Sequence, residues 1–254
     1  MRLTRCYVPG VLAADSEAAL PPGPAAHVAR VLRLRPGAPL ILFDGRGGEY
    51  QAIVRSLERD GSVRVRIGAH QAIEREAPLS LILLQCLVRN ERMDWIVQKA
   101  TELGVAAIMP VASRHTVVRL EPEAAERKRQ HWLSIAASAC EQCGRNRLPQ
   151  LHAVQTLEQA SRNTAGDSGS TRLVLDPESG TSLLQALPVA GSHGAGSLAL
   201  LVGPEGGLDA DELALLQRHG FVACRLGPRV LRAETAPLAA LAAVQALLGD
   251  IGRG

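Results

Sequence analysis

The sequence predicts an α/β protein in which a small β domain precedes a larger domain with a mostly parallel sheet. Two patterns support this prediction. Up to residue 73, short runs of strand-forming residues are separated by turns that contain glycine and aspartate. From Leu79 onward, apolar strands alternate with helical patterns, and that alternation is typical of parallel sheets with crossover helices. With 254 residues, 46% of them hydrophobic, the chain is long enough to form both parts.

The first domain is predicted to span residues 1–73 and to form a small β-barrel with one helix. Strands are expected at residues 40–43, 49–54 and 62–67. The third strand alternates strictly between apolar residues and arginine, as a half-buried strand does. Helical spacing over His27–Leu34 stops at Pro36-Gly37. The charged segment Ile73–Pro78, which ends in proline, is the predicted linker.

The second domain is predicted to span residues 78–254, and its first half contains two strands and two helices. Strands are expected at Leu79–Val88 and Val105–Val111. Between them lies a helix whose apolar residues fall on one face and whose C-cap is Gly104. These apolar residues are Met93, Ile96, Val97, Ala100 and Leu103. A long helix is expected over Pro122–Gly144.

The second half of this domain continues the alternation. Strands are expected at residues 172–175, 198–202 and 221–226. Asp209 followed by Glu212 predicts a capping box for a helix that runs to His219-Gly220. Thr235 is the expected N-cap of an Ala/Leu-rich helix that ends at Leu248. The polar stretches 161–171 and 190–196 are predicted to be flexible loops.

Positive charge is concentrated at the front of the chain. Residues 1–75 contain 11 Arg and 7 acidic residues, whereas residues 76–254 contain 17 Lys and Arg against 18 acidic residues. Lysine occurs only at Lys99 and Lys128, so nearly all of the positive charge is arginine. Arginine suits recognition of phosphates and bases. A GC-rich genome explains the ratio of arginine to lysine equally well, but it does not explain the position of the excess.

Several functional classes find no support in the sequence. No apolar run reaches membrane-spanning length, and the start of the chain lacks the apolar stretch of a signal peptide, so a soluble cytoplasmic protein is expected. The odd number of cysteines, five, fits reduced thiols. Cys140 and Cys143 form a C-x-x-C without a second ligand pair, so we expect two thiols on a helix and no metal site.

Two glycine- and proline-containing loops carry most of the functional information. Leu-Val-Gly-Pro-Glu-Gly-Gly-Leu occupies residues 201–208, and Leu-Gly-Pro-Arg-Val-Leu-Arg-Ala-Glu-Thr-Ala occupies residues 226–236. Each follows an apolar strand and precedes a helix. Neither has the spacing of a P-loop or of the dinucleotide-binding fingerprint. Either loop alone would be an ordinary turn, but together they predict a site for a flat, partly polar cofactor.

These two loops closely resemble those of the bacterial 16S ribosomal RNA uracil-N3 methyltransferase family, within the SPOUT methyltransferase superfamily. The resemblance extends over almost the whole chain. It includes His27-Val28-Ala29-Arg30-Val31-Leu32-Arg33, Phe43-Asp44-Gly45-Arg46-Gly47-Gly48-Glu49-Tyr50, Lys99-Ala100-Thr101-Glu102-Leu103-Gly104-Val105 and Glu141-Gln142-Cys143-Gly144-Arg145. One departure is Ala233, where the family often has threonine.

The resemblance implies the fold and the partners of the protein. It implies an N-terminal PUA-like β-barrel that binds RNA. It also implies a C-terminal SPOUT domain with a mostly parallel sheet, helices on both faces and a trefoil knot. The implied cofactor is S-adenosylmethionine, and the implied substrate is 16S rRNA of the 30S ribosomal subunit. The family is homodimeric, and the helix over residues 235–248 would then lie in the dimer interface.

The chemistry of uracil methylation suggests roles for individual residues near the two loops. We hypothesise that Arg232 stabilises the uridinate and that Glu234 is the base or a group that orients the base, with Glu205 as a rival for the second role. The candidate cofactor-binding residues are Leu201, Val202, Gly203, Glu205, Gly206, Gly207, Leu226, Gly227, Leu231, Thr235 and Ala236. The candidate RNA-binding residues are Arg30, Arg33, Arg35, Arg46 and Arg145.

Two other functions remain open from the sequence. A SPOUT ribose 2′-O-methyltransferase acting on rRNA or tRNA would share the fold and the cofactor. A non-catalytic RNA-binding protein would need no cofactor loops, although both are present. A nucleotide-phosphate enzyme is less favoured, because the P-loop lysine is missing. The target nucleotide, the choice between free rRNA and the assembled 30S subunit, and the identity of the base are also open.

Overall fold

The computed structural model describes residues 3–116, 121–164, 170–188 and 196–253. The chain forms two compact units. The first contains Met1–Glu76 and Ala137–Leu148, and the second contains Ala77–Ala136 and Pro149–Gly254. The sequence-based prediction had one boundary, between residues 73 and 78. In the structure, the first unit also includes the segment Ala137–Leu148.

The first unit is built on a five-stranded sheet with the order β1-β3-β4-β5-β2. Its strands are β1 (Arg5–Tyr7), β2 (Ser16–Ala19), β3 (Pro39–Phe43), β4 (Glu49–Leu57) and β5 (Val63–Gln71). The β1–β3 pair is parallel and the other pairs are antiparallel. Three of the strands follow the predicted pattern. The short strands β1 and β2 have too few alternating apolar residues to be recognised from the sequence.

The predicted helix over residues 27–34 begins earlier and ends earlier. It consists of the short α1 (Pro22–Ala26) followed by one π-helical stretch, η1 (His27–Val31). Pro22 and Pro24 suit the first turn, where the backbone N–H groups have no helical partner. The helix ends because Arg33 adopts a positive φ of 51°, which is incompatible with a continuing right-handed helix.

A buried polar network attaches the segment 137–148 to the sheet of the first unit. The Arg5 guanidinium donates to the Glu49 carboxylate at 2.6 Å and also to Oδ1 of Asn146. Asn146 donates to the same carboxylate at 3.1 Å. Arg75, which is partly exposed, makes a further ion pair with Glu49 at 3.1 Å. Arg5, Glu49 and Asn146 are all buried. Burying a polar or charged group without a hydrogen-bond partner costs free energy, so each of these side chains needs the others as partners.

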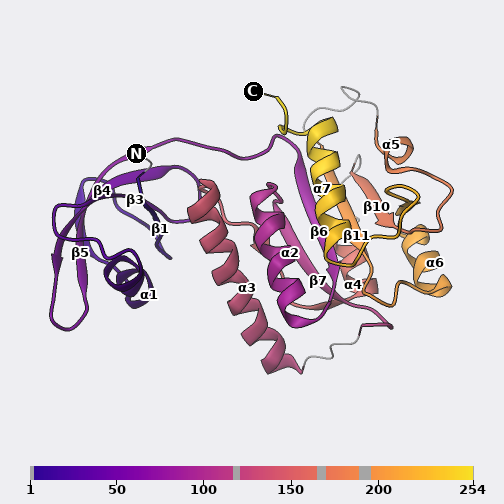
Figure 1. The fold of residues 1–254 in the computed structure, drawn as a ribbon, viewed down its shortest axis with the longest axis horizontal. Coiled ribbons are helices and arrows are strands. Elements are labelled where there is room, and N and C mark those ends of the chain that lie inside the picture. Colours follow the sequence, from indigo (N-terminus) through magenta and orange to yellow (C-terminus); the bar gives the residue numbers. More distant parts are fainter. Residues whose placement is uncertain (1–2, 117–120, 165–169, 189–195, 254) are drawn as a thin grey trace. The chain divides into compact units, whose positions relative to one another are not determined.

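The second unit contains a seven-stranded parallel sheet (Figure 1). The strand order is β12-β10-β11-β6-β7-β8, and the short β9 also pairs with β7. The strands are β6 (Ser80–Cys86), β7 (Ala107–Ala112), β8 (Gln150–Leu151), β9 (Gln155–Thr156), β10 (Thr171–Leu175), β11 (Ser197–Val202) and β12 (Val222–Cys224). Every pair in this sheet is parallel. The predicted parallel α/β architecture is therefore confirmed.

Helices cover both faces of this sheet. They are α2 (Asn90–Glu102), α3 (Pro122–Cys143), α4 (Leu157–Asn163), α5 (Leu183–Ala186), α6 (Ala210–Arg218) and α7 (Thr235–Leu248). Along β6, Leu81 and Leu83 pack in a core with α2, α7 and Trp132 of α3. Leu84 and Cys86 point to the opposite face and pack in a second core with α4 and α6. Because the strands carry apolar residues on both faces of the sheet, helices pack on both faces, and the unit has three layers: helices, sheet and helices.

The helix ends follow the sequence signals to within one residue. The C-cap of α2 is Leu103 rather than the predicted Gly104, and Gly104 follows it with the left-handed φ of +83° that is common just after a helix. Asp209 and Glu212 form the predicted capping box of α6, with hydrogen bonds of 2.9 and 3.1 Å. The predicted N-cap of α7 was wrong, because Glu234 is the N-cap residue and Thr235 is the first helical residue.

Two short helices were not predicted, although each begins with a capping box. Thr156 with Gln159 caps α4, and Ser182 with Gln185 caps α5. The predicted loop over residues 161–171 begins inside the end of α4, and its residues 165–169 lie outside the described residues. Residues 190–195 of the other predicted loop also lie outside them. The trefoil knot remains a prediction.

Candidate active site

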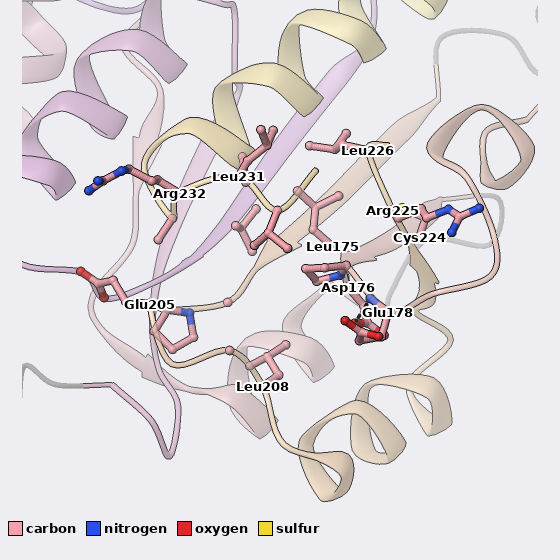
Figure 2. A pocket seen from close by; sticks show the side chains of 18 of the residues that line it. Leu175, Asp176, Glu178, Glu205, Leu208, Cys224, Arg225, Leu226, Leu231 and Arg232 are labelled. Carbon is pink, nitrogen blue, oxygen red and sulfur yellow. Dashed lines mark hydrogen bonds between the residues drawn. The ribbon is translucent and has the colours of Figure 1, made fainter. Parts of the chain in front are cut away.

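A pocket of about 640 Å³ lies in the second unit, where strands β10, β11 and β12 end (Figure 2). Because these strands are parallel neighbours, the loops that follow them meet at one edge of the sheet. Ligands of open α/β sheets bind at this edge. The two loops singled out in the sequence therefore lie on either side of the loop after β10, and all three line one cavity.

The first loop, after β11, needs glycine for two different reasons. Gly207 has a φ of +73°, which side-chain-bearing residues rarely adopt. At Gly206 an added Cβ would lie 3.0 Å from the Cβ of His115, so there is little room for a side chain. Gly203 is similarly close to Leu208, at 3.2 Å. These glycines let the loop turn tightly beside the pocket.

The second loop, after β12, supplies a large part of the apolar lining. Leu226 and Leu231 lie in the central part of the pocket, together with Leu175 and Leu208 (Figure 2). Gly227 also lines the pocket, and a Cβ added there would meet nothing within 4 Å. The glycine therefore leaves open space that a ligand can occupy.

The third loop, after β10, was missed in the sequence analysis. Asp176, Pro177 and Glu178 line the pocket. The backbone N–H of Asp176 donates to the carbonyl of Cys224, and its carboxylate accepts from the N–H of Glu178 at 3.0 Å. An apolar strand followed at once by Asp-Pro-Glu has the same strand-then-turn form as the other two loops. That sequence pattern could have identified the third loop that lines the pocket.

The charged groups lie at opposite ends of the pocket. Glu205 and Arg232 lie at one end, and Asp176, Glu178 and Arg225 lie at the other, with Leu175 and Leu231 between them (Figure 2). Such a cavity suits a ligand with an apolar centre and polar ends.

One further charged residue joins the Glu205 end of the pocket. Arg92, in the first turn of α2, places its Nη1 3.0 Å from Oε1 of Glu205 and 3.7 Å from Oε2 of Glu234. Arg92 also lines the pocket, and the sequence analysis did not select it.

Cys224 lines the pocket but is a poor candidate nucleophile. Its burial, together with the nearby Asp176, raises the pKa of the thiol to about 11. The reactive form of cysteine is the thiolate, so this thiol stays protonated and unreactive at neutral pH.

The structure brings most of the predicted cofactor-binding residues to the pocket. Those that line it are Val202, Gly203, Glu205, Gly207, Leu226, Gly227, Leu231 and Ala236. Leu201 instead faces the core formed with α4 and α6. Gly206 and Thr235 are not among the lining residues. Arg232 lines the pocket, whereas Glu234 is not among the lining residues and has its Oε2 3.7 Å from Nη1 of the lining residue Arg92.

The predicted RNA-binding arginines lie in the first unit and divide into two groups. Arg30, Arg33, Arg35 and Arg46 are exposed. Arg145 is only 4% exposed, and its guanidinium pairs with Glu76 at 2.5 Å. The proposal that Arg145 meets RNA therefore needs correction, because its guanidinium is buried in the structure and held by Glu76.

The described residues contain neither a candidate metal-binding cluster nor a helix suited to span a membrane. In residues 3–116, 121–164, 170–188 and 196–253, no group of three or more His, Cys, Asp or Glu side chains could hold a metal ion. Within the same ranges, no helix combines the length and the apolar character needed to cross a bilayer.

Comparison with known families decides which class of site this is. The model of the RNA methyltransferase domain matches residues 75–245, and the model of the RNA methyltransferase PUA domain matches residues 25–68. The chain is 32% identical to ribosomal RNA small subunit methyltransferase E of Bacillus subtilis, over 86% of this chain and 85% of that protein. The chain belongs to the ribosomal RNA small subunit methyltransferase E family.

Other members of this family are similar over most of their length. The Mycobacterium bovis enzyme is 35% identical over 87% of this chain and 83% of its own length. The crystal structure of the Neisseria gonorrhoeae enzyme, bound to S-adenosyl methionine, is 36% identical and has a TM-score of 0.90 over 98% of this chain and 100% of that chain. A Legionella pneumophila protein in complex with the cofactor SAM is 37% identical, with a TM-score of 0.91 over 98% and 100% of the two chains. The small β domain followed by a parallel α/β domain is thus the architecture of this family.

Proposed function

We propose that the protein transfers a methyl group from S-adenosylmethionine to N3 of a specific uridine in 16S rRNA of the small ribosomal subunit. The observation that carries this proposal is the three-loop pocket, in a chain that closely matches a small subunit methyltransferase solved with S-adenosyl methionine. Small-subunit rRNA methylation is the activity in the names of the relatives. The choice of uridine N3 rests on the resemblance of residues 201–208 and 226–236.

The residues of the pocket fit this cofactor. The central leucines suit the adenine ring, and the glycine loops leave backbone groups free to approach the ligand. Carboxylates at Asp176 and Glu178 suit hydroxyl and ammonium groups. The glycines 203, 206, 207 and 227 would hold the cofactor through the loop backbone, although the contact with Gly206 would be indirect because it does not line the pocket.

The chemistry requires removal of a proton from the base. When bound, the cofactor supplies an electrophilic methyl group whose bonding pair leaves with sulfur. Uracil N3 carries a proton at neutral pH and must lose it to become a nucleophile. In this proposal a Glu234 carboxylate oxygen accepts the proton, and the electron pair left on N3 forms the new bond to carbon. Arg232 stabilises the negative charge that develops on the flanking carbonyl oxygens.

The remaining parts of the proposal concern partners. A homodimer, as the resemblance implies, would use α7, which is rich in alanine and leucine and exposes Leu247. The same composition suits a helix packed only in its own core, so the dimer remains a prediction. Because ribosomal subunits are cytoplasmic, a small-subunit rRNA substrate would require a cytoplasmic enzyme, as the sequence analysis expects.

The direct test of the proposal is methyl transfer to ribosomal particles. Purified protein is incubated with methyl-labelled S-adenosylmethionine and with 30S or 50S subunits from a strain that lacks the modification. We expect label in the 16S rRNA of the 30S subunit and none in the 50S subunit. Free 16S rRNA in a third reaction distinguishes the assembled particle from naked RNA as substrate. Absence of label in both RNA forms would contradict the proposal.

Gly227→Ala should weaken cofactor binding without affecting folding. The added methyl group would meet no protein atom within 4 Å and would therefore occupy space in the pocket. We expect the dissociation constant for S-adenosylmethionine to increase roughly tenfold, because one extra methyl group in a binding pocket changes the free energy of binding by about 1–3 kcal/mol. Isothermal titration calorimetry measures the constant. Gly180→Ala, also in open space but outside the pocket, is the control and should bind normally.

The four exposed arginines of the first unit should make RNA binding strongly dependent on salt. Each arginine that neutralises a phosphate contributes about 0.7–0.9 to the slope of log K against log salt. The variant with alanine at positions 30, 33, 35 and 46 should therefore bind 30S subunits more weakly and with a shallower slope, while its affinity for the cofactor stays unchanged. Arg127→Ala, an exposed arginine of α3, is the control. An unchanged slope in the fourfold variant would contradict the assignment.

A further inference from the structure

We propose that Arg92 is a positioning residue that holds Glu234 in place as the proton acceptor, while Glu205 anchors Arg92. This inference rests on the proposed function and deepens it. The sequence analysis left open whether Glu205 or Glu234 acts as the base. The arrangement of these three charges at one end of the pocket distinguishes the two carboxylates.

The first observation is the unequal contact of Arg92 with the two carboxylates. Its Nη1 makes a hydrogen bond of 3.0 Å to Oε1 of Glu205. The same nitrogen lies 3.7 Å from Oε2 of Glu234, which is an ion-pair distance but too long for a hydrogen bond. Glu205 is therefore occupied by Arg92, whereas Glu234 is attracted to Arg92 and keeps its oxygen available as an acceptor.

The second observation is that Glu234 has no structural hydrogen bond of its own. It is the N-cap residue of α7, yet its side chain makes no capping hydrogen bond. Its Oε2 is buried and has no hydrogen-bond partner among the described residues. A buried carboxylate oxygen without a donor is costly unless a ligand supplies one. The N3–H of a uracil is a donor of the required kind.

The third observation concerns the position of Arg92 in its helix. It lies in the first turn of α2, where the helix dipole disfavours a positive side chain. Its side chain is 36% exposed, and ion pairs this exposed contribute little to stability. Neither helix stability nor the surface ion pair accounts for an arginine here. Holding the charge of Glu234 at the pocket does account for it.

The chain of contacts assigns a separate role to each residue. Glu205, on the loop after β11, fixes the guanidinium of Arg92. Arg92 then presents a positive charge 3.7 Å from Oε2 of Glu234 and orients the carboxylate. Glu234 accepts the N3 proton, and Arg232, at the same end of the pocket, faces the charge that develops on the uracil oxygens. Arg92 is 113 residues from Glu205 in sequence, and the fold brings it beside both Glu205 and Glu234.

The test compares Arg92→Gln, Glu205→Gln and the double variant with the wild-type enzyme. In single-turnover methyl transfer to 30S subunits, Arg92→Gln should lower the rate constant on the order of 100-fold, the lower range for loss of acid–base function. The KM for 30S subunits and the affinity for S-adenosylmethionine should stay within about twofold of wild type. Arg92→Lys should recover part of the rate, because it restores the charge without the second donor.

The double-mutant cycle separates this role from a merely structural one. If Glu205 acts through Arg92, the double variant should be no slower than Arg92→Gln alone, whereas independent roles would multiply their effects. Arg89→Gln removes the same charge at the same end of α2 and is the matched control with wild-type rate.

Each alternative outcome overturns the inference. A normal rate in Arg92→Gln, in a preparation whose wild-type enzyme is active, would refute the role of Arg92. A raised KM with an unchanged rate constant would show that Arg92 contacts RNA instead. Loss of cofactor affinity together with a lower melting temperature would show a structural role. Inactive wild-type enzyme on every RNA substrate would refute the proposed function, which is a separate result.

Discussion

Arg232→Ala should nearly abolish methyl transfer while the protein still binds its cofactor. The Arg232 guanidinium is exposed at the Glu205 end of the pocket and forms no ion pair with a described residue, so it is available to the substrate. Removing one group that stabilises developing negative charge lowers the rate constant by about 10²–10³. Single-turnover kinetics with 30S subunits measures the loss, and calorimetry measures the affinity for S-adenosylmethionine.

The matched control for this variant is Arg218→Ala, an exposed arginine at the end of α6. It should have the rate constant and cofactor affinity of the wild-type enzyme. Normal turnover in Arg232→Ala would rule out the proposed clamp. A loss of cofactor affinity equal to the loss of rate would instead assign Arg232 to cofactor binding.

Glu49→Ala should cause the largest loss of stability. Glu49 is 4% exposed and accepts hydrogen bonds from Arg5, Arg75 and Asn146. Its removal leaves the guanidinium of Arg5 buried without its counter-charge, and breaking a buried pair in this way costs about 3–5 kcal/mol. Urea denaturation followed by circular dichroism measures the free energy of unfolding. Glu17→Ala, which breaks the exposed pair with Arg55, is the control and should cost about 0–1 kcal/mol.

The same network predicts how stability depends on pH. Burial opposes ionisation of Glu49, but the hydrogen bonds from Arg5, Asn146 and Arg75 outweigh it and hold the pKa of Glu49 below its ordinary value of 4.5. The unfolded chain therefore binds this proton at a higher pH than the folded chain does. The contribution of Glu49 is complete above pH 4.5 and is lost as the pH falls through the folded pKa. A Glu49→Gln variant should lose less stability than wild type over that acid range.

The fold was largely predictable because the central strands β6, β7 and β11 are strongly apolar and the longer helices have clear sequence signals. Gly104 and the Asp209–Glu212 capping box predicted two helix ends to within one residue. The errors came from elements held by tertiary contacts. Strands β1 and β2 are too short to show periodicity, and Ala137–Leu148 belongs to the first unit through contacts such as Arg5 with Asn146. No local pattern reveals such contacts.

The candidate site was predictable where one continuous segment lines the pocket. Residues 202–207 and 226–236 were selected because each glycine- and proline-containing segment follows a strand and because both resemble the loops of a known family. Leu201 was selected with them, but strand alternation turns its side chain to the opposite face. Arg92 was missed because it lies on a helix far away in sequence. Arg145 could not be distinguished from the exposed arginines, because its burial depends on Glu76, which is distant in sequence.

The identity of the methylated nucleoside tests the central claim most directly. Methyl-labelled S-adenosylmethionine is incubated with the protein and 30S subunits from a strain that lacks the modification, and the 16S rRNA is digested to nucleosides and separated by liquid chromatography with mass spectrometry. Base methylation at N3 predicts that all of the label elutes as 3-methyluridine. Label in a 2′-O-methyl nucleoside would contradict it and would make the protein a ribose methyltransferase of the same superfamily.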